Sequence, residues 1–309
     1  MNYILSPDCK LVKGRSRSAI YDLRRTTIYL VPNTFVMHIV QNTINVEDLS
    51  EDEYCIMDYL LVHQYFLPSS GLTVSQLSTI ELYPNYISNC VIQYNEDFPF
   101  KDMAIQLRKL GCEAITFVVN YVRNLREFFS NISYFYGSAG NISIHTSYNK
   151  SLLCKMKEEK NFADAISNII IYDSPSSKTI NCGKCTIAFS LMKLDNLMCD
   201  RSTFKLVIGR RFYNESLIFN NCLYKKLTIK KTGEITNCPM SLVSYGNVFS
   251  NPSYIDIVSS KKFQKCWYVN KDKIKECQDC ELKYACLDCR YMVDGSFTLE
   301  RPWWCDYPL

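Results

Sequence analysis

Cysteine placement is the feature of this sequence that most constrains its fold. The chain of 309 residues holds 16 cysteines, and eight of them fall between Cys222 and Cys305. The other eight are scattered between Cys9 and Cys199, as is typical of small buried apolar side chains. Crowded cysteines in a chain without a secretion signal are typical of metal ligands, because disulfides are rare in reducing compartments. We therefore predict that the last third of the chain folds around bound metal.

Composition argues against several classes of function. The chain is 47% hydrophobic and 21% charged, which is the ordinary balance of a globular protein. A formal net charge of +4 is too small to predict a nucleic-acid-binding face, so we expect no nucleic-acid partner. No run of about 18 apolar residues is present, so we expect no membrane partner. Residues 1–17 lack the apolar stretch of a signal peptide, which predicts a cytoplasmic location.

The first predicted domain covers residues 1–78. Three short strands are expected, at residues 9–12, 19–23 and 27–31, separated by turn-prone stretches. A capping-box pattern, Ser50 followed three residues later by Glu53, predicts the start of a helix. Three strands followed by helices are typical of a winged-helix-like unit.

The second predicted domain covers residues 79–205 and has an α/β pattern. The expected strands and helices alternate in the order strand 87–94, helix 100–110, strand 114–120, helix 122–136, strand 142–146, helix 150–160, strand 166–172 and strand 186–191. Alternation of this kind predicts parallel βαβ units, here about half of a (β/α)₈ barrel. Residues 174–181 are expected to be a polar connector. A third domain is expected at residues 206–309, and strands are expected at 204–213, across its boundary, and at 223–229.

The crowded cysteines have an ordered spacing. Its form is C-x₁₀-G-x₄-C, then C-x₂-C-x₅-C-x₂-C, then a final cysteine, made by Cys222, Gly233, Cys238, Cys277, Cys280, Cys286, Cys289 and Cys305. A C-x₂-C loop turns both sulfurs toward one point and aims backbone N–H groups at them. Zinc sites usually separate two such pairs by about 12–20 residues, whereas only five separate them here. The spacing favours an iron–sulfur cluster, and structural zinc remains the alternative.

This cysteine order resembles the pattern of SPASM domains, which follow radical SAM barrels in peptide-modifying enzymes. The more specific resemblance, strong over residues 230–309, is to the SPASM-domain peptide maturases of grasp-with-spasm systems. It rests on residues 233–239, 245–248, Trp267, 271–274 and above all 277–290. One departure is that two residues, Leu287 and Asp288, separate the fifth and sixth cysteines, where the usual pattern has three.

The resemblance implies iron–sulfur cofactors. By analogy, one 4Fe–4S cluster would be held by Cys277, Cys280, Cys286 and Cys305. A second cluster, which the sequence leaves open, would be held by Cys238 and Cys289, with Cys222 as a third ligand and Cys266 or Cys199 as the fourth.

The resemblance also raises the question of radical chemistry. A radical SAM enzyme carries a C-x₃-C-x₂-C loop after its first barrel strand, but the corresponding residues 94–99 contain no cysteine. We therefore expect a truncated, degenerate radical-SAM-type barrel that uses no S-adenosylmethionine, and we predict no catalytic residues. Cys182 and Cys185 form an isolated C-x₂-C pair, interpreted either as a turn before the strand at 186–191 or as metal ligands.

The implied function is accessory to peptide maturation. The first domain resembles the PqqD-like elements that capture the leader of a precursor peptide as an added strand beside a helix. The expected peptide-binding residues are Thr27, Ile28, Tyr29, Leu30, Tyr54 and Asp58. In the family, an ATP-grasp ligase then crosslinks the peptide, so this ligase and the leader peptide are the expected partners. Two alternatives remain: a redox or peptide-modifying enzyme that acts through its cluster, and a scaffold stabilised by zinc.

Overall fold

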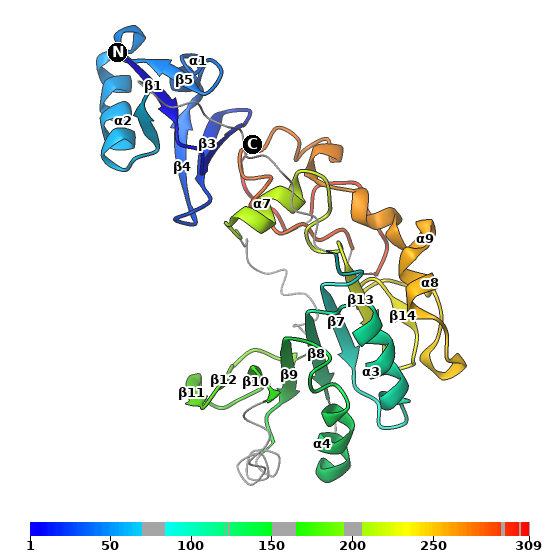
Figure 1. Ribbon diagram of the computed structural model, residues 1–309. Helices are drawn as coiled ribbons and strands as arrows, with labels where there is room; N and C mark the ends of the chain where they lie inside the picture. Colours follow the sequence, from blue (N-terminus) through cyan, green and yellow to red (C-terminus); the bar gives the residue numbers. More distant parts are fainter. Residues whose placement is uncertain are drawn as a thin grey trace.

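The computed structural model describes residues 1–69, 84–120, 122, 124–149, 165–194, 206–291, 294–302 and 304–308. In this part of the chain an N-terminal unit lies at one end and a large sheet at the other, with the loop-rich C-terminal region between them (Figure 1). The chain is thus a mixed α/β protein, as predicted. No described helix combines the length and the apolar character needed to cross a membrane.

The N-terminal unit contains two small antiparallel sheets. The predicted strands are confirmed as one sheet with the order β2-β3-β4, formed by Cys9–Lys13, Arg17–Asp22 and Thr27–Pro32. The second sheet has the order β5-β1-β6 and was not predicted; its strands are Thr43–Asn45, Asn2–Leu5 and Phe66–Pro68. These strands have only three or four residues each, too few for a clear alternation of apolar and polar positions.

Helices close the core of this unit. A short helix, α1 (Asn33–Met37), and a 3₁₀ turn, η1 (Val46–Asp48), precede the longer α2 (Glu51–Val62). The capping box at the start of α2 is confirmed, because the Ser50 side chain accepts from the Glu53 amide and the Glu53 carboxylate accepts from the Ser50 amide. Met57 and Leu60 on α2 pack against the buried side chains of both sheets.

The middle of the chain forms an eight-stranded sheet with the order β11-β12-β10-β9-β8-β7-β13-β14. The strands are β7 (Asn89–Gln93), β8 (Ala114–Val119), β9 (Asn141–Ser147), β10 (Asn168–Tyr172), β11 (Lys178–Cys182), β12 (Cys185–Phe189), β13 (Lys226–Ile229) and β14 (Ile235–Thr236). All neighbours are parallel except the two edge strands, β11 and β14. Helices α3 (Phe100–Lys109) and α4 (Leu125–Ser133) lie together on one side of the sheet (Figure 1). The predicted helix at 150–160 lies outside the described residues.

Two expectations about this region are wrong. Residues 174–181 are not only a connector, because Lys178–Cys182 forms the edge strand β11. All five of its residues are exposed, including the apolar Ile180, so the strand has no buried apolar face that would reveal it. Residues 204–213 are not a strand, because α7 (Arg210–Ser216) begins within them. An i,i+4 ion pair of 3.0 Å between Arg211 and Glu215 favours this helix.

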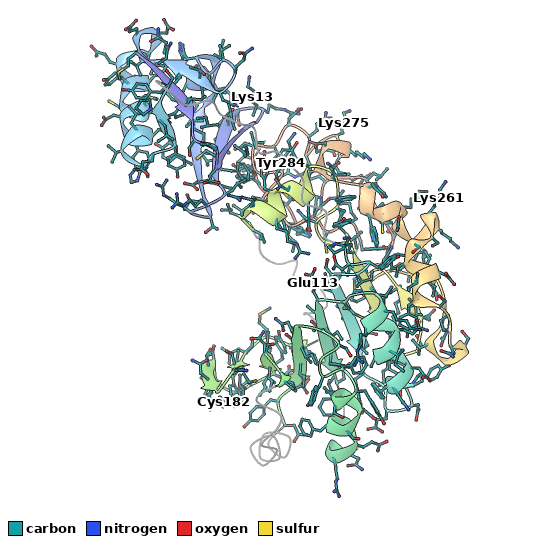
Figure 2. All side chains as sticks on the ribbon, viewed as in Figure 1. Lys13, Glu113, Cys182, Lys261, Lys275 and Tyr284 are labelled. Carbon is teal, nitrogen blue, oxygen red and sulfur yellow. The ribbon has the colours of Figure 1, made fainter. Side chains whose placement is uncertain are left out.

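The C-terminal region is joined to both other units. Its strands β13 and β14 extend the large sheet, since β13 pairs in parallel with β7. Short helical segments follow: η3 (Val248–Ser250), α8 (Tyr254–Ser259), α9 (Lys261–Gln264), η4 (Lys265–Tyr268) and η5 (Lys271–Lys273). A separate small core, which includes Tyr21, Tyr213 and Ala285, connects the N-terminal sheet to α7 and to the cysteine-rich segment. Figure 2 shows Tyr284 at this junction.

Candidate metal centre

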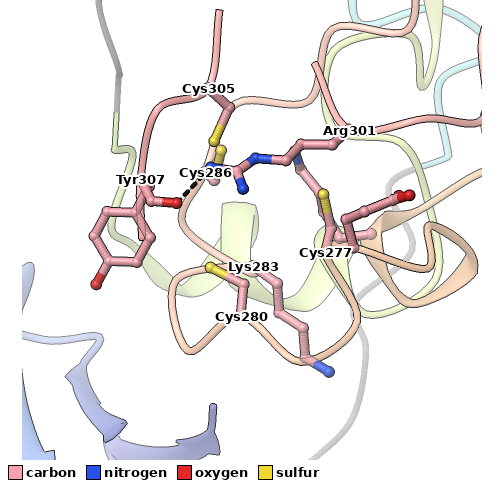
Figure 3. A pocket seen from close by; sticks show the side chains of 9 residues that line it. Cys277, Cys280, Lys283, Cys286, Arg301, Cys305 and Tyr307 are labelled. Atoms are coloured by element: carbon pink, nitrogen blue, oxygen red, sulfur yellow. Dashed lines mark hydrogen bonds between the residues drawn. The ribbon is translucent and has the colours of Figure 1, made fainter. Parts of the chain in front are cut away.

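Four of the predicted ligands share one cavity. Its volume is about 310 Å³, a value that counts space open to solvent. The cavity is lined by Lys271, Glu276, Cys277, Cys280, Lys283, Cys286, Arg301, Cys305 and Tyr307 (Figure 3). The structure therefore brings together the same four cysteines that the sequence assigned to a first cluster, although their role as ligands stays a prediction.

Successive tight turns position these thiols. The Cys280 amide donates to the Cys277 carbonyl at 3.1 Å, and the Cys286 amide donates to the Leu282 carbonyl at 2.9 Å. The chain thus folds back on itself within ten residues, counted from Cys277 to Cys286. Cys305 reaches the same cavity from a distant turn, where its amide donates to the Pro302 carbonyl at 2.9 Å.

A buried carboxylate holds the loop between Cys280 and Cys286. The Glu281 residue is only 1% exposed. Its Oε1 atom accepts from Arg17 Nε at 2.9 Å and from the Tyr307 hydroxyl at 2.6 Å. The Tyr21 hydroxyl donates to the Glu281 carbonyl at 2.7 Å. The N-terminal sheet, the cysteine loop and the C-terminal segment are therefore joined at one residue.

The close approach at Gly14 supports a first prediction. A β-carbon on Gly14 would lie 2.4 Å from the Arg17 carbonyl oxygen and 2.6 Å from Glu281 Oε2. We expect Gly14→Ala to destabilise the protein by about 1–3 kcal/mol, because the loop and the hairpin must move apart. Gly209→Ala is the matched control, since a β-carbon there meets nothing within 4 Å. Thermal unfolding of both variants tests this; equal midpoints would contradict the contact.

A buried charge network lies behind the cavity. Asp288 is 1% exposed and Arg290 fully buried. The Asp288 Oδ1 atom lies 3.2 Å from Lys271 Nζ and 2.7 Å from an Arg290 terminal nitrogen, without the alignment of a hydrogen bond. Asn220 Nδ2 donates to Asp288 Oδ2 at 2.8 Å. The shortened spacing before Cys289 therefore contains the residue that organises two buried cations.

Burial favours the protonated form of three thiols of the cavity, those of Cys277, Cys280 and Cys286. Burial raises the pKa of Cys280 to about 11 and also raises the pKa of Cys277 and Cys286. The Lys271 ammonium opposes this effect at Cys277 and Cys286, because a nearby positive charge favours the thiolate. Metal binding at this place would thus release protons.

The other lining groups fit an anionic metal–thiolate group. Thiolates are soft ligands that suit zinc or iron–sulfur clusters. Lys271, Lys283 and Arg301 supply positive charge around them. Arg301 Nε is buried and has no hydrogen-bond partner in the described part of the chain, while another nitrogen of the same guanidinium donates to the Tyr307 carbonyl. A thiolate or an inorganic sulfide would accept this remaining N–H.

The thiols do not converge on a single point. Within the described residues, no three or more His, Cys, Asp or Glu side chains are placed so that they could hold one metal ion. In a 4Fe–4S cluster the four thiolates bind different irons, whereas zinc draws all its sulfurs to about 2.3 Å from one centre.

The remaining predicted ligands gather around a second polar cluster. Asn237 Nδ2 donates to Cys266 Sγ at 2.8 Å, and its Oδ1 accepts from the Tyr291 hydroxyl at 2.7 Å. The Cys289 thiol lies 3.8 Å from the Tyr291 carbonyl. Burial raises the pKa of Tyr291, and the neighbouring Cys266 and Cys238 raise it further.

Cys266, one of the two proposed fourth ligands, belongs to this group. Burial raises its pKa to about 12, and the charge of Cys222 acts in the same direction. Cys238 and Cys289 are buried, and Cys222 is partly exposed. Cys199, the other proposed fourth ligand, lies outside the described residues.

The predicted peptide-binding residues lie on two elements of the N-terminal unit, the strand β4 and the helix α2. Thr27, Ile28, Tyr29 and Leu30 belong to β4, which is an edge of its sheet among the described strands. Tyr54 and Asp58 lie on α2 and are exposed. Sequence reasoning missed the residue that joins the two elements: Tyr59 of α2 stacks on Tyr29 with ring centroids 4.7 Å apart.

Comparison with known proteins gives only distant likenesses. No protein-family model matches the sequence, and no curated protein matches it. Selenomethionine-labelled BtrN in an open conformation superposes with a TM-score of 0.40 and 13% identity, over 64% of this chain and 94% of that chain. BtrN in complex with AdoMet and 2-DOIA superposes with a TM-score of 0.39 and 13% identity, over 69% of this chain and 98% of that chain. SuiB from Streptococcus suis superposes with a TM-score of 0.33 and 12% identity, over 93% of this chain and 95% of that chain. Likenesses at this level assign no function.

Sequence reasoning also missed the non-cysteine residues of the cavity. Arg301 lines it from a position that no spacing pattern marks, and Glu281 accepts a hydrogen bond from the hydroxyl of the lining Tyr307. Tyr307 also lines the cavity, and only the folding of the C-terminal segment brings it there. The turn-prone stretch that contains Gly14 was recognised, but its contact with Glu281 joins residues far apart in the chain.

Proposed function

We propose that this protein is an accessory maturation factor for a ribosomally made, post-translationally modified peptide. It binds the leader of the precursor peptide and presents it to a partner ATP-grasp ligase in the cytoplasm. Residues 1–78 recognise the peptide, residues 79–205 form a degenerate barrel that uses no S-adenosylmethionine, and residues 206–309 form a SPASM-type domain. The partner ligase is inferred from the sequence resemblance of residues 230–309.

One observation carries the proposal. Four thiols share a cavity with three cationic side chains, and Glu281 attaches the loop that bears them directly to the N-terminal sheet. A metal group at this place would hold the C-terminal region in shape and fix the position of the N-terminal unit. The cluster acts in this account as a structural element.

The proposed cofactor is a 4Fe–4S cluster on Cys277, Cys280, Cys286 and Cys305. Its support is the all-thiolate donor set and the positive charge that surrounds it. A second iron–sulfur cluster is proposed beside Tyr291. Its ligands would be Cys222, Cys238 and Cys289, with Cys266 as the adjacent fourth thiol.

The proposed peptide site is the edge of β4 beside α2. An edge strand presents unpaired backbone groups on which an extended peptide can add a strand. Leu30 is 37% exposed and Tyr59 is 43% exposed, so apolar surface is available beside that edge. Peptide binding there would place the leader on the unit that Glu281 attaches to the cysteine loop.

A charge at this edge tests the peptide site. We expect Leu30→Glu to weaken binding of the leader at least about tenfold, because a carboxylate would lose water at an apolar contact. Fluorescence anisotropy with labelled peptides copied from the short reading frames beside the gene measures the affinity. Val62→Glu is the matched control, since Val62 is 70% exposed on α2. Equal affinities for both variants and the unchanged protein would contradict the site.

A further inference from the structure

A pair of cysteines lies far from both candidate metal centres. Cys182 and Cys185 flank the turn between β11 and β12, at one edge of the eight-stranded sheet. The C-terminal region joins the sheet at its opposite edge through β13 and β14. Seven strand-to-strand steps of about 4.8 Å separate the two edges, or roughly 30 Å. Figure 2 shows Cys182 at this outlying edge, and the proposed function leaves the pair unused.

The hairpin places the two cysteines opposite each other. Cys182 and Cys185 are register partners in the antiparallel pair of β11 and β12. Gly183 takes the positive φ of +59° that a two-residue turn of this kind needs at its first central position. Directly opposed residues in antiparallel strands have α-carbons about 4.5–5.5 Å apart, with side chains on the same face. Disulfides span α-carbon distances of about 4.4–6.8 Å, so the register suits a cross-strand disulfide.

The two thiols differ in their access to solvent. Cys182 is exposed, on a strand whose five residues are all exposed, whereas Cys185 is only 1% exposed. Burial raises the pKa of Cys185, and the neighbouring Cys182 raises it further. A reagent from solvent can thus reach the Cys182 thiol, and the Cys185 thiol lies next to it.

We propose that Cys182 and Cys185 are a redox pair that forms a reversible disulfide by exchange with a low-molecular-weight disulfide. The Cys182 thiolate attacks one sulfur of the reagent and displaces the other as a thiolate. Cys185, as its thiolate, then attacks Cys182 Sγ in this mixed disulfide and displaces the second half of the reagent. The protein loses two protons and two electrons, and the reagent leaves as two thiols.

The position of the pair favours a role in thiol–disulfide exchange over a role in stabilising the fold. A disulfide stabilises a chain more when it closes a longer loop. Here the bond would close a loop with only Gly183 and Lys184 between the cysteines, and the strands on either side are already paired. The exposed edge strand makes the same pair accessible to a reagent.

Tryptic mapping tests the proposal without interference from the other cysteines. Trypsin cleaves after Lys178, Lys184 and Lys193, so residues 179–184 and 185–193 form separate peptides, each with one cysteine. The folded protein is treated with oxidised glutathione, its remaining thiols are alkylated at acidic pH, and the digest is analysed by mass spectrometry without reduction. We expect the two peptides to appear joined, and to separate when dithiothreitol is added before alkylation.

Variants separate a true pair from two independent thiols. In Cys185→Ser, we expect Cys182 to remain as a glutathione mixed disulfide, because no second thiol resolves it. Cys55 is the internal control, an exposed cysteine on α2 that should carry glutathione in every sample that is not reduced with dithiothreitol. The proposal is overturned if wild-type Cys182 keeps glutathione while Cys185 is alkylated, or if both are alkylated while Cys55 is modified. These outcomes do not depend on metal content or peptide binding.

Discussion

Replacing Cys286 with alanine is expected to remove the metal group from the first cavity and to unfold the C-terminal region around it. Cys286 is 5% exposed and lines the cavity together with three other thiols. Structural metal binding contributes free energy directly to folding, on the order of 10 kcal/mol in small metal domains. We therefore expect a loss of several kcal/mol of stability, seen as a lower urea midpoint, together with loss of bound metal.

An exposed cysteine provides the control for this variant. Cys55 lies on α2 outside the cavity, and alanine is a strong helix former, so Cys55→Ala should leave stability and metal content nearly unchanged. If Cys286→Ala kept the full metal content and the wild-type urea midpoint, the cavity would not be a metal centre.

Asp288→Asn is expected to give the second largest effect. The substitution keeps the shape of the side chain but leaves Lys271 and Arg290 buried without their counter-charge. Removing one partner of a buried ion pair typically costs about 3–5 kcal/mol. The Asp288 carboxylate also raises the pKa of Lys271, although burial by itself would lower it. Urea unfolding of the metal-loaded protein measures this loss.

The control for this variant is an exposed carboxylate on the same segment. Asp279 pairs with Arg15 at 3.4 Å, and both side chains are about half exposed. Because surface ion pairs contribute about 0–1 kcal/mol, Asp279→Asn should change the urea midpoint little. A similar small change for Asp288→Asn would show that the buried network does not stabilise the cysteine region.

Much of the fold could be predicted because several elements carry a strong local signal. The apolar strands of the large sheet and the three strands β2, β3 and β4 appear where they were expected. Ser50 and Glu53 mark the start of α2 through a side-chain pattern that acts within one turn. Signals of this kind depend on residues close in sequence, so a single chain is enough to find them.

The elements that were missed depend on distant contacts. The residues of β11 are all exposed, so no buried apolar face marks the strand, which exists because β12 pairs with it. Apolar and polar residues alternate only weakly over residues 204–213. The ion pair between Arg211 and Glu113, at 2.9 Å, joins α7 to the turn before β8. Local sequence pattern does not encode these pairings.

The candidate site shows the same division. The resemblance of the cysteine order to SPASM domains, and not the spacing alone, grouped the four thiols that line one cavity, and their role as ligands stays a prediction. It did not predict Arg301, whose Nε points at no protein acceptor in the described residues, or Glu281, which joins three segments. Both acquire their role only when the N-terminal sheet and the C-terminal segment meet.

The central claim is that the four thiols of the first cavity hold an iron–sulfur cluster. Anaerobic purification, followed by visible absorption and by analysis of iron, acid-labile sulfide and zinc, tests it most directly. We expect a brown protein with broad visible absorption and about four iron and four sulfide per cluster, with the share of the first cluster lost in Cys286→Ala and retained in Cys55→Ala. A colourless protein that contains zinc and no iron would contradict it.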